Sequence, residues 1–161
     1  MTISEIRAAL LEVSLVKELP RHMRRRMAMI FLWTTESRMV EAGEHVYEQG
    51  AQDENGGSIL VSGTVEIAKA GCEAEVVSAP EVLGEIQQFM PNRERTATVK
   101  SLEGGCILTF SWQDLADAAA EVFTPGECEI LRALITQMAW GRCAELFDQQ
   151  VSRVAGAQDA G

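Results

Sequence analysis

Short β-prone runs separated by glycines fill the middle of the sequence, from about Arg38 to Phe110. Glycine adopts positive φ angles without steric cost, so this spacing marks tight turns between strands. Apolar residues recur at helical spacing on both sides of this region, for example at Met23 and Met27 before it. The sequence therefore predicts an α+β fold, in which an antiparallel, jelly-roll-like β-roll is flanked by N-terminal helices and a long C-terminal helix.

The chain has 161 residues, which is enough for one domain with its own hydrophobic core. We predict one domain overall. Its expected parts are N-terminal helices packing on the roll (1–37), the β-roll (38–110), C-terminal helices (111–154) and a disordered tail (155–161).

Local signals place several turns and helix ends. Gly63 is expected to make a tight turn after a strand whose Ile59 face is apolar and whose Leu60 face is mixed, as in a half-buried strand. Ser4 with Glu5 predicts the start of the opening helix, and Ser111 is expected to cap a later one.

The final helix is expected to begin at Thr124 and to reach about Val154. Its apolar residues form two stripes, which predicts two partners in burial. One stripe can cover the roll, and the other predicts a homodimer through this helix. The stripes consist of Ile130, Leu134 and Met138, and of Leu131, Ile135, Ala139, Cys143, Phe147 and Val151.

The formal net charge of −10 argues against binding to nucleic acid or to an anionic membrane. The N-terminal region lacks the unbroken apolar run that a signal peptide or a membrane span requires, so neither is expected there. Cysteines at wide spacings favour reduced thiols in a cytoplasmic protein over a zinc site.

The acidic chain contains one basic cluster, which is either a solvated helix face or a docking site for an acidic partner. Its arginines are Arg21, Arg24, Arg25 and Arg26.

A glycine-carboxylate step at Gly84-Glu85 is followed ten positions later by Arg95, around a short apolar turn. A carboxylate can accept a hydrogen bond from a ribose hydroxyl, and a guanidinium fork matches the exocyclic oxygens of a phosphate. These groups suit a cyclic nucleotide. Arg93 is a second cation nearby, but the Thr96 and Ala97 that follow favour Arg95.

These residues carry a resemblance to a known family. The segment from Gly84-Glu85 to Arg95-Thr96-Ala97, ending in β-prone Thr98-Val99, resembles the phosphate-binding cassette (84–99) of the cyclic-nucleotide-binding domain. That family includes the catabolite activator protein and the regulatory subunits of protein kinase A. The early strands are similar as well, at 43–50 and 58–67.

The resemblance implies a role for each residue of the cassette. Glu85 accepts the ribose 2′-hydroxyl, and Arg95 neutralises the cyclic phosphate. The backbone N–H groups of Ile86 and Gln87, at the start of a short helix, point at the phosphate. Gln87 and Gln88 depart from the family, which carries small or apolar residues there.

The base is left open between cAMP and cGMP. The Thr96 hydroxyl can accept a hydrogen bond from the exocyclic amino group of guanine, whereas threonine here also occurs in cAMP binders. Contacts to the base are expected from the last helix, without a choice among several candidates. They are the polar Thr136, Gln137, Arg142 and Glu145, and the apolar Ile135, Trp140 and Leu146.

The predicted function is that of a regulatory module without enzymatic activity or a cofactor. It binds a cyclic mononucleotide and signals through its C-terminal helix to an unidentified protein effector or to a dimer interface. One alternative is a roll that binds no nucleotide and acts as a protein-interaction module. Another is a cupin-like metalloenzyme, which the isolated His22 and His45 disfavour.

Overall fold

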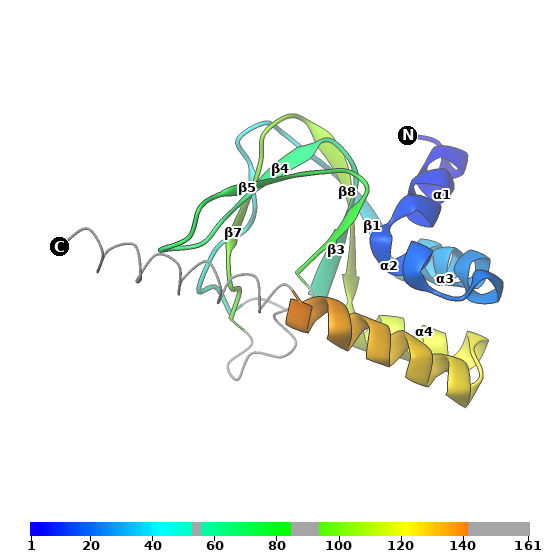
Figure 1. Cartoon of the computed structure of the whole chain (residues 1–161). Coiled ribbons are helices and arrows are strands. Elements are labelled where there is room, and N and C mark those ends of the chain that lie inside the picture. Colours follow the sequence, from blue (N-terminus) through cyan, green and yellow to red (C-terminus); the bar gives the residue numbers. More distant parts are fainter. Residues whose placement is uncertain (53–55, 85–93, 142–161) are drawn as a thin grey trace.

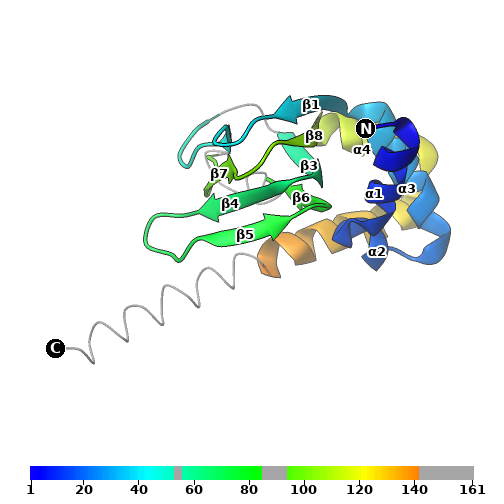
Figure 2. The same ribbon diagram turned by 90° about the horizontal axis from the view of Figure 1, so that it is seen from above.

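A computed structural model describes residues 1–52, 56–84 and 94–141 of the chain. Helices α1 to α3 come first, eight strands follow, and helices α4 and 125–141 come last. The helices gather at one end of the β-roll, and β4, β5 and β7 lie at the other (Figures 1 and 2). The fold is the predicted α+β arrangement of an antiparallel roll and flanking helices.

Two four-stranded antiparallel sheets form the roll. In the first, the strands lie in the order β1 (Glu36–Val40), β8 (Gly105–Ser111), β3 (Gly56–Ser62) and β6 (Glu81–Leu83). In the second, the order is β2 (His45–Tyr47), β7 (Thr98–Ser101), β4 (Thr64–Ala68) and β5 (Glu75–Ser78).

Gly63 lies where the chain passes from β3 in one sheet to β4 in the other. Its φ of 96° confirms that this turn needs a glycine. A Cβ atom at Gly105, on β8, would lie 2.2 Å from the backbone oxygen of Ser62. The two glycines let the backbones meet where the sheets change, so the turn is a corner of the roll and not a hairpin.

Strand β3 is buried on both faces. Ile59 and Val61 belong to the core beneath the helices, whereas Leu60 belongs to a second core inside the roll. The prediction of a half-buried strand was wrong, because the mixed Leu60 face, which periodicity alone leaves to solvent, is covered by the other sheet inside the roll.

Three helices precede the roll: α1 (Ile3–Glu12), α2 (Ser14–Glu18) and α3 (Arg21–Thr34). The cap of α1 is Thr2, whose hydroxyl accepts a hydrogen bond from the Glu5 backbone N–H at 3.2 Å. The Glu5 carboxylate accepts a return bond from the Thr2 N–H. The helix thus begins at Ile3, before the predicted Ser4, because Glu5 completes a capping box with Thr2.

Helix α4 (Trp112–Val122) begins with the predicted cap, since the Ser111 hydroxyl accepts a bond from the Asp114 N–H at 3.0 Å. The chain is helical again over 125–141. Residues of both apolar stripes of this last helix pack against the same core, which lies beneath the helices. The two stripes therefore share one partner in burial, and the second stripe no longer calls for another subunit. These residues are Leu131, Leu134, Ile135 and Met138; Cys143, Phe147 and Val151 lie outside the described residues.

The basic cluster is divided between two half-buried and two exposed arginines. Arg24 donates to the backbone oxygen of Leu19 at 2.9 Å, and Arg26 binds Glu127. Arg21 and Arg25 are exposed. Two of the four arginines thus hold helices in place, and two form the solvated face that the sequence allows.

Glu127 ties the start of the last helix to α3. Its carboxylate accepts two hydrogen bonds from the Arg26 guanidinium, at 2.5 and 3.1 Å. It also accepts a bond from the Thr124 N–H at 3.1 Å, while the Thr124 hydroxyl accepts one from the Glu127 N–H. The bond from Arg26 is the main reason that the pKa of Glu127 is lowered to about 2.

We expect Glu127→Gln to destabilise the protein at neutral pH and to have little effect near pH 2. A carboxyl group with a depressed pKa in the folded state stabilises that state above its unfolded pKa. The contribution of Glu127 is therefore lost as pH falls from about 4.5 to about 2. Urea unfolding of both proteins at several pH values measures it.

Glu129→Gln is the matched control, because Glu129 pairs with Arg132 on the same helix with both side chains 70% exposed. It should unfold like the wild type at every pH. Equal pH profiles of unfolding for the wild type and Glu127→Gln would contradict the assignment of the ion pair between Glu127 and Arg26.

Candidate functional site

Gly84 stands directly after β6 with a φ of 85°. A Cβ atom there would lie 2.7 Å from Nη1 of Arg95 and 3.2 Å from the hydroxyl oxygen of Tyr47. Side chains other than glycine rarely adopt this φ, and here they would also collide with the arginine. The structure thus brings together Gly84 and Arg95, which are eleven residues apart in the sequence.

Arg95 is buried, with 5% of its surface exposed. Its guanidinium carbon lies 3.8 Å from the centroid of the Tyr47 ring, within the range of a cation–π interaction. Burial of an arginine costs free energy unless other groups compensate its charge, so the fold must provide such contacts at this position.

The backbone of Arg95 is held by the connection that follows β2. Its N–H donates to the Ala51 oxygen at 2.9 Å, and its oxygen accepts from the Gly50 N–H at 2.8 Å. Nearby, the Thr98 hydroxyl accepts a bond from the Gln49 N–H at 3.0 Å. These bonds fix the chain on both sides of Thr96 and Ala97, which are half-buried.

Tyr47 and Ser58 also belong to this place in the fold, although the sequence gives no functional sign of them. The Tyr47 hydroxyl lies 2.5 Å from Oγ of Ser58, and both residues are buried. Tyr47 is the one tyrosine of the chain, and a buried hydroxyl needs a partner. The presence of a single tyrosine was the only hint in the sequence, and it indicates a structural role and not a ligand site.

Glu85, Ile86 and Gln87 lie outside the described residues, as does Gln88. Their predicted contacts with ribose and phosphate stay predictions. The described part of the cassette is Gly84 together with the segment from Glu94 onward.

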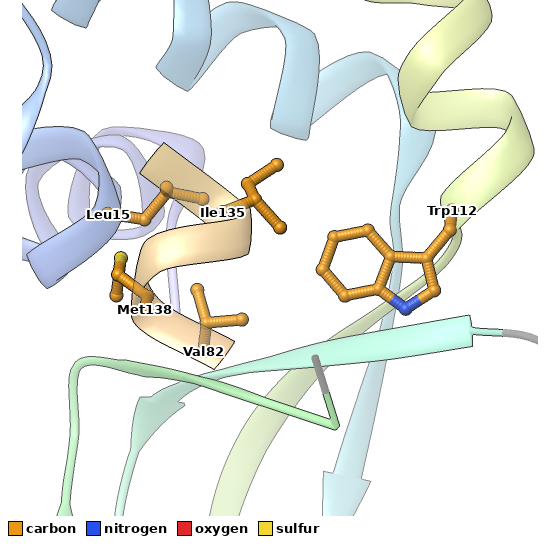
Figure 3. A pocket seen from close by; sticks show the side chains of 5 residues that line it. All are labelled: Leu15, Val82, Trp112, Ile135 and Met138. Atoms are coloured by element: carbon orange, nitrogen blue, oxygen red, sulfur yellow. The ribbon is translucent and has the colours of Figure 1, made fainter. Parts of the chain in front are cut away.

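An apolar pocket lies between the roll and the last helix (Figure 3). Its lining is apolar side chains from α2, β6, α4 and the last helix, so it offers nothing to bind a phosphate. Its Val82 stands two residues before Gly84, so the pocket connects the edge of the candidate site to the last helix. The lining residues are Leu15, Val82, Trp112, Ile135 and Met138.

Four of the seven candidates for base contacts lie in the described part of the last helix. Ile135 faces the apolar pocket, and the Thr136 hydroxyl donates to the backbone oxygen of Arg132 at 2.9 Å. Gln137 and Trp140 are exposed, Trp140 at 62%. The remaining candidates, Arg142, Glu145 and Leu146, lie outside the described residues.

The described residues include no group of three or more His, Cys, Asp or Glu side chains placed to hold a metal ion. His22 lies 3.4 Å from Glu127 and His45 lies 3.1 Å from Glu48, each beside a single carboxylate. Among the described residues Cys72, Cys106 and Cys128 are free thiols. No helix in the described ranges has the length and apolar character that crossing a bilayer requires.

Solved structures with the same fold include regulators that are distant in sequence. The catabolite activator protein of Thermus thermophilus matches with a TM-score of 0.63 at 16% identity, over 88% of this chain and 62% of that one. The sensor domain of the transcriptional regulator DNR from Pseudomonas aeruginosa matches at 0.60 and 19%, over 84% and 91%. This chain thus spans less than two thirds of the Thermus protein.

The regulatory domain of protein kinase A from Toxoplasma gondii, solved with cAMP, matches with a TM-score of 0.56 at 18% identity, over 78% of this chain and 46% of that one. None of the curated proteins matches the sequence. The family model described as "Cyclic nucleotide-binding domain" matches residues 37–122, which is more than half of the chain. The protein belongs to the cyclic nucleotide-binding domain family.

Proposed function

We propose that this domain binds a cyclic mononucleotide, cAMP or cGMP, and acts as a regulatory module without catalysis or a cofactor. The observation that carries the proposal is the buried Arg95 guanidinium beside Gly84, in a chain of this family. A guanidinium in a sheltered place binds phosphate oxygens more strongly than one in open solvent.

The proposed site consists of seven residues with separate roles. Arg95 binds the exocyclic phosphate oxygens, Glu85 accepts the ribose 2′-hydroxyl, and Thr96 faces the base. Gly84 leaves room for the guanidinium, and Ala97 keeps the wall beside it small. Backbone N–H groups of Ile86 and Gln87 complete the phosphate contacts.

Calorimetric titration with cAMP and with cGMP tests the proposal. Binding of either nucleotide at micromolar concentration supports a sensor. Dissociation constants above about 1 mM for both, equivalent to about 4 kcal/mol of binding free energy, would refute it. A module for protein interaction would then be the better description.

The ligand is proposed to act on the last helix. Val82, two residues before Gly84, lines the same apolar pocket as Ile135 and Met138 of that helix. If the nucleotide binds one position of this strand edge more tightly than another, it shifts the equilibrium between two positions of the last helix. The size of the shift is set by the difference between the two affinities. The output is an effector protein or a second copy of the chain, and not nucleic acid or a membrane, given the net charge of −10.

Association through the last helix is part of the proposal, since Ile130 and Trp140 are exposed on it at 43% and 62%. Light scattering that gives a monomer mass at micromolar concentration would refute the homodimer.

A cytoplasmic location is proposed from the free thiols at Cys72, Cys106 and Cys128.

Thr96→Ala should weaken cGMP binding and leave cAMP binding nearly unchanged. Only guanine has the exocyclic amino group that donates to this hydroxyl, and one hydrogen bond changes affinity by about threefold to tenfold. Parallel titrations with both nucleotides measure the selectivity. Thr96→Ser, which keeps the hydroxyl, is the control, and equal losses for both nucleotides would contradict the role.

A further inference from the structure

The ring of Tyr47 covers the guanidinium of Arg95. The two side chains come from different parts of the roll, and the ring centroid lies 3.8 Å from the guanidinium carbon. A guanidinium that stacks on an aromatic ring at this distance keeps its plane close to the ring, while its N–H groups point outward in that plane. The ring thus restricts the directions in which Arg95 donates hydrogen bonds.

The ring itself is fixed at its hydroxyl. Tyr47 belongs to β2 in one sheet, whereas Ser58 belongs to β3 in the other. Their oxygens lie 2.5 Å apart, and Ser58 is only 1% exposed. Ser58 is also the partner of Leu83 in the pairing of β3 with β6, directly before Gly84. The hydrogen bond therefore fastens the ring to the strand pair that leads into the candidate site.

The backbone at Gly84 limits the arginine from another side. Atoms of both Arg95 and Tyr47 lie within 3.2 Å of the point that a Cβ would occupy there. Arg95 is thus confined by an aromatic ring and by a glycine backbone, which leaves little freedom to its guanidinium. A cation held in this way has lost its side-chain entropy before a ligand arrives.

We propose that Tyr47, fixed by the hydroxyl of Ser58, is a positioning residue that sets the orientation of the Arg95 guanidinium toward the exocyclic oxygens of a bound phosphate. This inference rests on the proposed function, because the phosphate is that of the cyclic nucleotide. Tyr47 acts through Arg95 and needs no contact with the ligand.

The orientation of the fork is measurable with phosphorothioate analogues. A cyclic phosphodiester has two exocyclic oxygens, and replacing one or the other by sulfur gives two diastereomers. A guanidinium held in one orientation binds the diastereomer that presents oxygen to it more tightly, because sulfur is the weaker acceptor. The ratio of the two dissociation constants therefore reports the orientation of Arg95, and a smaller folded fraction does not change it, because both apparent affinities fall equally.

We expect Tyr47→Leu to weaken binding of the nucleotide that wild type prefers by about tenfold and to reduce the ratio of diastereomer affinities by at least about threefold. Tyr47→Phe and Ser58→Ala both keep the ring and lose its hydrogen bond, one from each side. Both should therefore fall between the wild type and Tyr47→Leu. Val65→Ala is the control, because Val65 is buried in the same core inside the roll; it should lower stability without changing the ratio.

The outcomes separate the inference from the function on which it rests. Nucleotide binding by wild type with the same diastereomer ratio in Tyr47→Leu would overturn the positioning role and leave the proposed function standing. A ratio reduced equally in Val65→Ala would also overturn it, as a general effect of loosened packing. Absence of binding to wild type would overturn the proposed function and, with it, the ligand for which Arg95 is positioned.

Discussion

Arg95→Ala should lower the affinity for either cyclic nucleotide by about 100-fold or more. Hydrogen bonds from a charged donor contribute up to about 3 kcal/mol each to the binding free energy. Without Arg95, the bound phosphate would also lose its solvent without gaining this partner in return. Arg95 is 5% exposed and is held by a ring and by two backbone bonds. Calorimetry with cAMP and cGMP measures the loss.

Two further variants interpret that result. Arg95→Lys keeps the charge but not the planar fork, so it should recover only part of the affinity. Arg93→Ala removes the same charge two positions earlier and should bind like the wild type. Circular dichroism checks that Arg95→Ala is folded. If the folded variant bound the nucleotides with wild-type affinity, the assignment of Arg95 as the phosphate-binding residue would be wrong.

Gly84→Ala should impair both the fold and the site. An alanine at a φ of 85° costs about 1 to 2 kcal/mol of stability. Its Cβ would also stand 2.7 Å from Nη1 of Arg95, so the guanidinium must leave its place on the Tyr47 ring. We therefore expect a lower urea midpoint together with a loss of nucleotide affinity of about tenfold or more.

Gly43→Ala is the matched control for this substitution. Gly43 also has a φ of 85°, but nothing lies within 4 Å of the position that its Cβ would take. It should lose similar stability and keep the affinity of the wild type. If Gly84→Ala and Gly43→Ala bound the nucleotide equally well, the contact between Gly84 and Arg95 would have no part in ligand binding.

Signals within a few residues of one another were predicted well. Ser111 caps α4 as expected, and Gly63 adopts the positive φ that its turn requires. Capping and turn geometry depend on neighbours three or four residues away, so the sequence contains the whole cause. Thr2 was missed as the cap of α1 only because Ser4, two positions later, is also a good capping residue.

Predictions that depended on distant contacts were less complete. The second face of β3, that of Leu60, is buried because the other sheet of the roll covers it. Both stripes of the last helix pack on the one core beneath the helices. Periodicity shows which residues share a face, but the packing partner of that face is a property of the tertiary structure.

The sequence by itself determined the α+β class, the turns at glycine and the family, and it singled out Gly84 and Arg95 as parts of one cassette. Only the tertiary structure decided that the guanidinium of Arg95 lies on the Tyr47 ring and that Ser58 holds that ring. Tyr47 and Arg95 are 48 positions apart, and no local pattern connects them. Their contact exists because β2 pairs with β7 in one sheet, and the closing of the two sheets into a roll brings Ser58 of β3 to the same place.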